Sequence, residues 1–119
     1  MELAVRYASE QELQTLSELA RAKLDPAAED IARQYHDLNN NFHMSVAKLS
    51  RNPYLINALQ NVLNLLRRDL FTDMRRNSLE KALEAHVLVA QAMIDRDLER
   101  ALRVTTDQIN VVERRLCIR

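Results

Sequence analysis

The most restrictive feature of this 119-residue sequence is that it contains no glycine, and that only Pro26 and Pro53 interrupt it. Chains that fold into sheets normally use glycine at tight turns, where the backbone takes positive φ angles. Helices joined by short connections have less need of it. We therefore predict an all-α fold, a compact antiparallel bundle of about six helices that forms a single domain over residues 1–119.

Charge and cysteine content exclude several classes of function. Seventeen basic and seventeen acidic side chains cancel, so the chain has no overall positive field with which to hold a nucleic acid backbone. The single cysteine, Cys117, allows no internal disulfide, and we assign it no role. Because the sequence shows no signal peptide and no apolar run long enough to span a membrane, we expect a cytoplasmic protein without a membrane partner.

Capping signals divide the first half of the chain into helices. Ser9 followed by Glu12 is a capping box, which should open a helix that ends near residue 24. Asp25 and Pro26 then predict the cap and first turn of a long helix. That helix should end near Arg51.

The next helix, predicted from Pro53 to about residue 71, is apolar over more than half of its circumference. Asn52 and Pro53 provide its cap and first turn. A helix that is apolar on more than one side is either central in the bundle or in contact with a second subunit. After a polar break, Asn77 or Ser78 should cap a fifth helix, and Asp97 should cap the last one.

Four polar side chains fall on, or directly beside, the faces that helical periodicity predicts to be buried. Asn39 and His43 lie four residues apart and so share one face of the long helix, beside its apolar stripe. His86 belongs to the inward stripe of the fifth helix, and Gln108 takes a position of the last helix where a core would favour leucine. These side chains could form a ligand or metal pocket between facing helices, or each could be a core residue satisfied by a neighbouring hydrogen bond.

Motifs for catalysis are absent from the sequence. No serine or cysteine stands in a nucleophile motif, no HExxH pair occurs, and no glycine-rich loop could cradle a phosphate. We therefore predict that the chain is not an enzyme. A structural or protein-interaction bundle is one alternative to a ligand sensor. A histidine-based metal protein for redox or storage is another, although its di-iron version would need a Glu-x-x-His pair that the sequence lacks.

Four short motifs, taken in order, resemble one protein family. They are Asn-x-x-Phe-His at residues 39–43, Asn-Pro-x-Leu at 52–55, Glu-Ala-His at 84–86 and Ala-Met-Ile-Asp-Arg-Asp-Leu-Glu-Arg-Ala at 92–101. In these motifs the chain resembles the FCD domain, the C-terminal effector-binding domain of one branch of GntR-type bacterial transcription regulators. The opening stretch, residues 3–13, is similar to that family's junction between its first two helices, so the resemblance covers essentially the whole chain.

The resemblance implies a helical bundle that binds a small molecule, usually a carboxylate metabolite, and passes its occupancy to a winged helix-turn-helix domain upstream. That domain is not in this sequence, so we expect any contact with DNA to be made through it alone. Such domains commonly form homodimers, which suits the apolar helix around Leu59 and Leu66. The alternative function is a helical dimerisation module with a vestigial pocket.

The resemblance also implies positions for a metal site. Many family members hold a divalent metal with an aspartate and three histidines, and these positions fall on Asn39, His43, His86 and Gln108. Two of these are amides, which are neutral and poor ligands for zinc, nickel or manganese. The site could be free of metal and bind the effector by hydrogen bonds. It could instead retain a metal through His43 and His86, with water, the effector, an amide oxygen or His36 completing the shell.

An anionic effector would need a cation. Arg67 and Arg68 are the candidates, because a guanidinium can bind a carboxylate with two parallel hydrogen bonds. The alternative for these arginines is a solvated pair at a helix C-terminus. We expect Tyr35 and Tyr54 to be core or interface aromatics.

Overall fold

The computed structural model describes the backbone of residues 1–27, 29–65 and 75–117, and the side chains of these residues up to residue 107. This part of the chain contains no strand, and the all-α prediction is confirmed. The helices follow one another as α1 (Glu2–Tyr7), α2 (Glu10–Ala20), α3 (Ile31–Leu49), α4 (Pro53–Leu65), α5 (Arg76–Ile94) and α6 (Leu98–Cys117).

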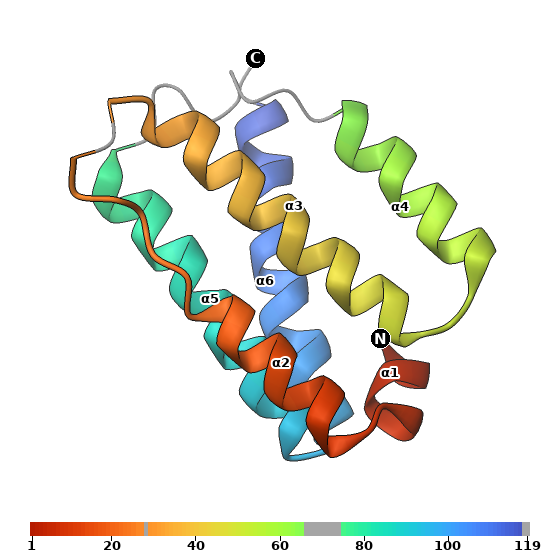
Figure 1. Ribbon diagram of the computed structural model, residues 1–119. Helices are drawn as coiled ribbons and strands as arrows, with labels where there is room; N and C mark the ends of the chain where they lie inside the picture. Colours follow the sequence, from red (N-terminus) through yellow and green to blue (C-terminus); the bar gives the residue numbers. More distant parts are fainter. Residues whose placement is uncertain (28, 66–74, 118–119) are drawn as a thin grey trace.

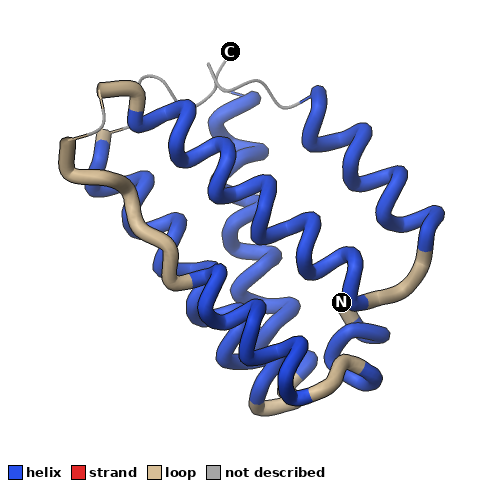
Figure 2. Tube along the Cα trace, in the orientation of Figure 1, coloured by secondary structure: helices blue, strands red, loops and turns tan. Residues whose placement is uncertain are grey.

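Successive long helices run in alternating directions, as the antiparallel prediction requires (Figure 1). The helices α3 and α5 therefore run the same way, and α2, α4 and α6 run against them. The helix α5 packs against α2 and α6, and α3 packs against α2, α4 and α5. The loops that join α1 to α2, α3 to α4 and α5 to α6 all lie at one end of the bundle (Figure 2). The C-terminal ends of α3 and α5 thus reach the junction of α1 and α2.

Buried apolar side chains form two clusters along α3 and α5. The larger cluster draws on α1, α2, α3, α5 and α6 and contains Phe42 and Val89. The smaller one contains Tyr35 and Leu83. Asn39 lies between Tyr35 and Phe42 on α3, and His86 lies between Leu83 and Val89 on α5, so these two polar residues mark the boundary between the clusters.

Most of the predicted caps form as expected. The Ser9 hydroxyl accepts a hydrogen bond from the Glu12 amide while the Glu12 carboxylate accepts one from the Ser9 amide, both at 3.0 Å. The Asn52 Oδ1 atom accepts hydrogen bonds from the first turn of α4, and Asp97 accepts one from the Arg100 amide at the start of α6. Local polar signals therefore set these three helix starts correctly.

The predicted start of the long helix at Asp25 and Pro26 is wrong. The helix α3 begins at Ile31, and its N-cap is Asp30, whose carboxylate accepts a hydrogen bond from the Arg33 amide at 3.0 Å. The Asp25 carboxylate instead accepts one from the Ala27 amide, two residues on, which makes a turn that competes with helix formation.

Two other boundaries also differ from the prediction. The helix α2 ends at Ala20 and not near residue 24. The helix α5 starts at Arg76 with Arg75 as its N-cap, so Asn77 and Ser78 lie within its first turn. The Arg75 side chain makes no capping hydrogen bond, so the sequence contains no polar capping signal at this position.

The helix α4 is peripheral, so the alternative that it is central in the bundle is wrong. It packs mainly against α3, and Leu63 is its one fully buried residue. Tyr54, Val62 and Leu65 are 85%, 52% and 79% exposed. The second alternative, contact with another subunit, stays a prediction. The predicted extension of this helix beyond Leu65, and Leu66 with it, lies outside the described residues.

Candidate functional site

Periodicity along α3 places three side chains of the Asn-x-x-Phe-His motif on the inner face of the bundle. Phe42 is fully buried at 1% exposure, and Asn39, three residues before it, is buried at 9%. His43 follows Phe42 and is partly buried. Because helical neighbours lie three or four positions apart, Asn39 comes next to both rings.

The helix α5 contributes His86, which is 1% exposed. Its Nε2 atom lies 3.1 Å from Asn39 Oδ1. An amide oxygen can only accept, so His86 must carry its proton on Nε2 and donate it to Asn39. The Tyr35 hydroxyl donates to the same oxygen at 3.4 Å. Asn39 thus accepts hydrogen bonds from a neighbouring turn of α3 and from α5.

Three aromatic rings pack together beside this hydrogen bond. The Phe42 and His86 rings are stacked, with centroids 4.4 Å apart and an angle of 20° between their planes. His43 meets both rings edge-on, at 5.1 Å from His86 and 5.4 Å from Phe42. The stacking covers one face of the His86 ring, and the ring of His43 lies across its edge.

Burial makes the cluster electrically neutral at physiological pH. Loss of solvation lowers the pKa of His86 to about 3, and His43 nearby adds to this effect. Burial likewise lowers the pKa of His43, and it raises the pKa of Tyr35 to about 12. The imidazoles and the phenol therefore act as neutral donors and acceptors.

A comparison with protein families decides what kind of chain this is. The family model for the FCD domain matches residues 1–110. The chain belongs to the FCD family. No curated protein and no solved structure matches it significantly.

The FCD domain is the FadR C-terminal domain found in GntR-family regulators. It is an effector-binding, regulatory domain, and the proteins that contain it are transcription regulators, which are not enzymes. Within the described residues of this FCD domain, no helix is both long and apolar enough to cross a membrane.

The structure brings together three of the predicted site residues of the FCD domain, Asn39, His43 and His86. Gln108 lies on α6 at a position where the side chain is outside the described residues, and Arg67 and Arg68 fall outside them entirely. Their roles stay predictions.

The described side chains do not suit a divalent metal. They contain no group of three or more histidine, cysteine, aspartate or glutamate residues that could hold one. Asn39 Oδ1 already accepts two hydrogen bonds, and His86 Nε2 is protonated toward it. A metal at this place would have to displace both bonds and would find no negative charge. His36 does not complete such a site either, because no group of three potential ligands among the described residues includes it.

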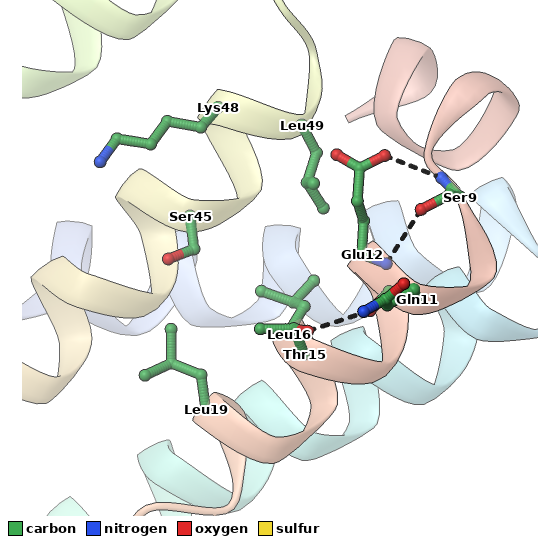
Figure 3. Close-up of a pocket in the computed structure, with 9 residues that line it drawn as sticks. All are labelled: Ser9, Gln11, Glu12, Thr15, Leu16, Leu19, Ser45, Lys48 and Leu49. Carbon is green, nitrogen blue, oxygen red and sulfur yellow. Dashed lines mark hydrogen bonds between the residues drawn. The ribbon is translucent and has the colours of Figure 1, made fainter.

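A surface cleft of about 410 Å³ lies between α2 and α3 (Figure 3). Its lining includes Leu16, Leu19 and Leu49, with Ser45 and Lys48 on the α3 side. None of the residues that line it belongs to the histidine cluster, so the cleft and the cluster of the FCD domain are separate features.

Tyr35 is the member of the cluster that sequence analysis assigned only to the core or an interface. It is buried in the core as expected, but its hydroxyl also joins the hydrogen-bonding network. Its position four residues before Asn39 was the available signal, because side chains at that spacing lie next to each other on a helix.

Proposed function

We propose that this chain is the effector-sensing domain of a GntR-family regulator, and that a small metabolite binds beside Asn39, His43 and His86. The observation that carries the proposal is the buried contact between Asn39 on α3 and His86 on α5, at 3.1 Å. It places polar groups of two helices at the boundary between two apolar clusters. Pockets that bind small molecules in helical bundles commonly have such a polar group set in apolar walls.

The chemistry of the cluster favours an effector held by hydrogen bonds without a metal. Neutral His43 offers one N–H donor and one acceptor nitrogen, and its ring stands edge-on to His86. Gln108 would add an amide from α6. A small carboxylate is the class of effector we propose, with Arg67 and Arg68 as the cations that would balance its charge.

Binding would act on the packing of α3 against α5. An effector that contacts both helices stabilises one relative position of them over others. We propose that this change reaches a winged helix-turn-helix domain in the full cytoplasmic regulator, and that DNA is contacted only there. The neutral charge of this chain supports such a division of labour.

The exposed face of α4 is the surface we propose for homodimerisation. Leu55, Ala58, Val62 and Leu65 follow one another at steps of three, four and three, which is the spacing of a helix-to-helix seam. All four are exposed, and residues 53–65 contain no charged side chain. Two copies of an uncharged face can meet across a two-fold axis without setting like charges opposite each other. The seam covers about two heptads, so the dimer should be weak unless other residues extend it.

Metal analysis and thermal melts test the effector proposal together. Protein purified without a histidine tag or chelator is assayed for metal by mass spectrometry. It is then melted with zinc, nickel and manganese salts and with a panel of small carboxylates. We expect no stoichiometric metal, and a carboxylate that raises the melting temperature, since a ligand at 100 times its Kd adds about 2.7 kcal/mol of stability.

Two variants assign any thermal shift to the cluster. The shift should disappear in His43→Ala and persist in His36→Ala, a partly buried histidine on the same helix. If the parent protein contains near-stoichiometric metal and the His43→Ala, His86→Ala double variant loses it, the proposal of a metal-free site is wrong and the effector site binds a metal. If neither metal nor any carboxylate shifts the melt, a helical dimerisation module with a vestigial pocket becomes the better description.

A further inference from the structure

Two arginines occupy backbone positions where proteins usually place glycine. Arg51 and Arg96 both have φ of 56°, the left-handed region, and each follows the C-cap of a helix, Ser50 of α3 or Asp95 of α5. At the end of α5 the Asp97 amide donates to the Ala92 carbonyl and the Arg96 amide to the Met93 carbonyl. This is the hydrogen-bonding pattern of a Schellman cap, which favours glycine at the residue that Arg96 occupies.

The Arg96 side chain gives a reason for this unfavourable choice. Its Nη1 atom donates to the Val5 carbonyl and its Nη2 atom to the Ala8 carbonyl, each at 2.7 Å. These carbonyls lie at the C-terminal end of α1, where the last backbone oxygens of a helix lack partners within the helix. A guanidinium is suited to bind two such oxygens at once, because its donors form a rigid fork.

Arg51 reaches the same region from the end of α3. Its Nη2 atom lies 2.9 Å from the Glu12 carboxylate. Glu12 also completes the capping box with Ser9 at the start of α2, as the dashed lines in Figure 3 show. Both side chains of this ion pair are partly exposed, so the pair alone contributes less than the two bonds of Arg96.

The two arginines therefore hold one segment, residues 5–12, which we call the elbow. It spans the end of α1 and the start of α2. Its two anchors directly follow the C-caps of α3 and α5, two helices that run in the same direction and end beside the elbow (Figure 1). These are also the helices that carry Asn39 and His86, which bond to each other across the bundle.

We propose that Arg51 and Arg96 form a two-point clamp, through which the position of the elbow and α1 follows the relative placement of α3 and α5. A shift of either helix along or away from the other displaces one anchor relative to the other, and the elbow must move or release a contact. The clamp deepens the proposed function, on which it rests for the idea that an effector moves α3 against α5. The two arginines act as positioning residues and contact no effector.

Hydrogen exchange of the unliganded chain tests whether the clamp holds the elbow. Arg96→Gly removes the guanidinium, and glycine adopts the left-handed backbone conformation at this position without strain. We expect roughly tenfold faster amide exchange in the elbow, relative to the centre of α5, and a smaller increase in Arg51→Gly. Arg103→Ala removes an exposed arginine of α6 and should change nothing there. Arg96→Lys should fall between the parent and Arg96→Gly, since an ammonium lacks the rigid fork.

A double-variant comparison tests the coupling without any effector. Asn39→Leu breaks the bond between α3 and α5, and we expect it to alter exchange in the elbow of the parent chain. In the Arg51→Gly, Arg96→Gly double variant, adding Asn39→Leu should cause no further change in the amide exchange of the elbow. His86→Phe, which removes the same bond from the α5 side while Asn39 keeps its bond from Tyr35, replaces Asn39→Leu if that variant does not fold.

Three results would overturn the clamp: unchanged elbow exchange in Arg96→Gly, no response of the elbow to the core substitution, or an equal response with and without the arginines. None of these measurements uses an effector. The clamp can therefore fail while the sensing function stands, and a failed effector screen would leave the clamp intact.

Discussion

Asn39 joins two helices through a single buried amide oxygen. Its oxygen accepts hydrogen bonds from Tyr35, four residues away in the sequence, and from His86, which is 47 residues away. A buried donor that loses its acceptor keeps the full cost of its desolvation. The stability of the bundle therefore depends on one amide at the boundary between the two apolar clusters.

Replacing Asn39 with leucine should destabilise the fold although it adds an apolar side chain. His86 Nε2–H and the Tyr35 hydroxyl would both be left without this acceptor, at a cost of about 1–3 kcal/mol in the free energy of unfolding. Urea denaturation followed by circular dichroism measures this cost. Asn41→Leu on the exposed side of the same helix is the control and should change the free energy by less than about 0.5 kcal/mol. Equal effects of the two substitutions would show that the buried network contributes nothing.

The titration of His86 predicts a loss of stability in mild acid. Its pKa is about 3 in the folded chain, below its usual value of 6.5, so between these values the unfolded chain binds more protons. The stability that this histidine contributes is complete above pH 6.5 and is lost as the pH falls toward 3. At pH 5 the loss should be about 2 kcal/mol from this residue.

Melting temperatures from pH 7 to pH 4.5 test this prediction. The fall should be shallower in His86→Gln, whose side chain does not titrate, and should persist in His36→Gln. A parent chain whose melting temperature is constant over this range would contradict the burial of a neutral His86.

At the scale of the helices, the start of α3 shows how two acidic residues compete for the same role. Asp30 caps α3 through the Arg33 amide, whereas Asp25 closes a turn with the Ala27 amide. Both are exposed aspartates that precede the same helix, but only Asp30 accepts a hydrogen bond from an amide of that helix. The pair therefore offers a matched test of the cap.

We expect Asp30→Ala to lower the free energy of unfolding by about 1 kcal/mol, because the Arg33 amide loses its acceptor. Asp25→Ala should cost less, since a turn amide on the surface can bond to water. Denaturant unfolding of the two variants measures the difference. A larger effect at Asp25 would mean that the helix starts there in solution, as its place before Pro26 first indicated.

At the scale of the whole molecule, the exposed face of α4 is the feature that a lone bundle does not explain. Val62 is 52% exposed in the middle of its seam. Leu88 on α5 is 58% exposed but lies outside the seam, so it provides a control of similar exposure. Large exposed apolar patches are typical of interaction sites, whereas single exposed leucines are ordinary.

The dimer prediction is that Val62→Glu weakens self-association roughly tenfold or more, because it sets two carboxylates near each other in an apolar contact. Leu88→Glu should leave self-association unchanged, and both variants should melt close to the parent. Sedimentation equilibrium over a range of concentrations measures the association. Monomeric parent protein, or equal effects of the two substitutions, would remove α4 as the dimer surface.

Several features of this protein follow from its sequence because they depend on residues close together in the chain. The lack of glycine predicts helices, and the capping box of Ser9 with Glu12 sets the start of α2 from a spacing of three residues. The period of the α-helix was enough to place Asn39 and His43 on one face and His86 on a buried one. Their use as an effector site stays a prediction.

Only the tertiary structure decides which residues meet across long separations in the chain. It joins Asn39 to His86, sets Arg51 against Glu12, 39 residues away, and sets Arg96 against Val5, 91 residues away. It also leaves α4 at the edge, although its sequence is apolar on more than one side. Periodicity states that a face is apolar, but which neighbour covers that face depends on how all the helices pack together, and no local pattern contains that information.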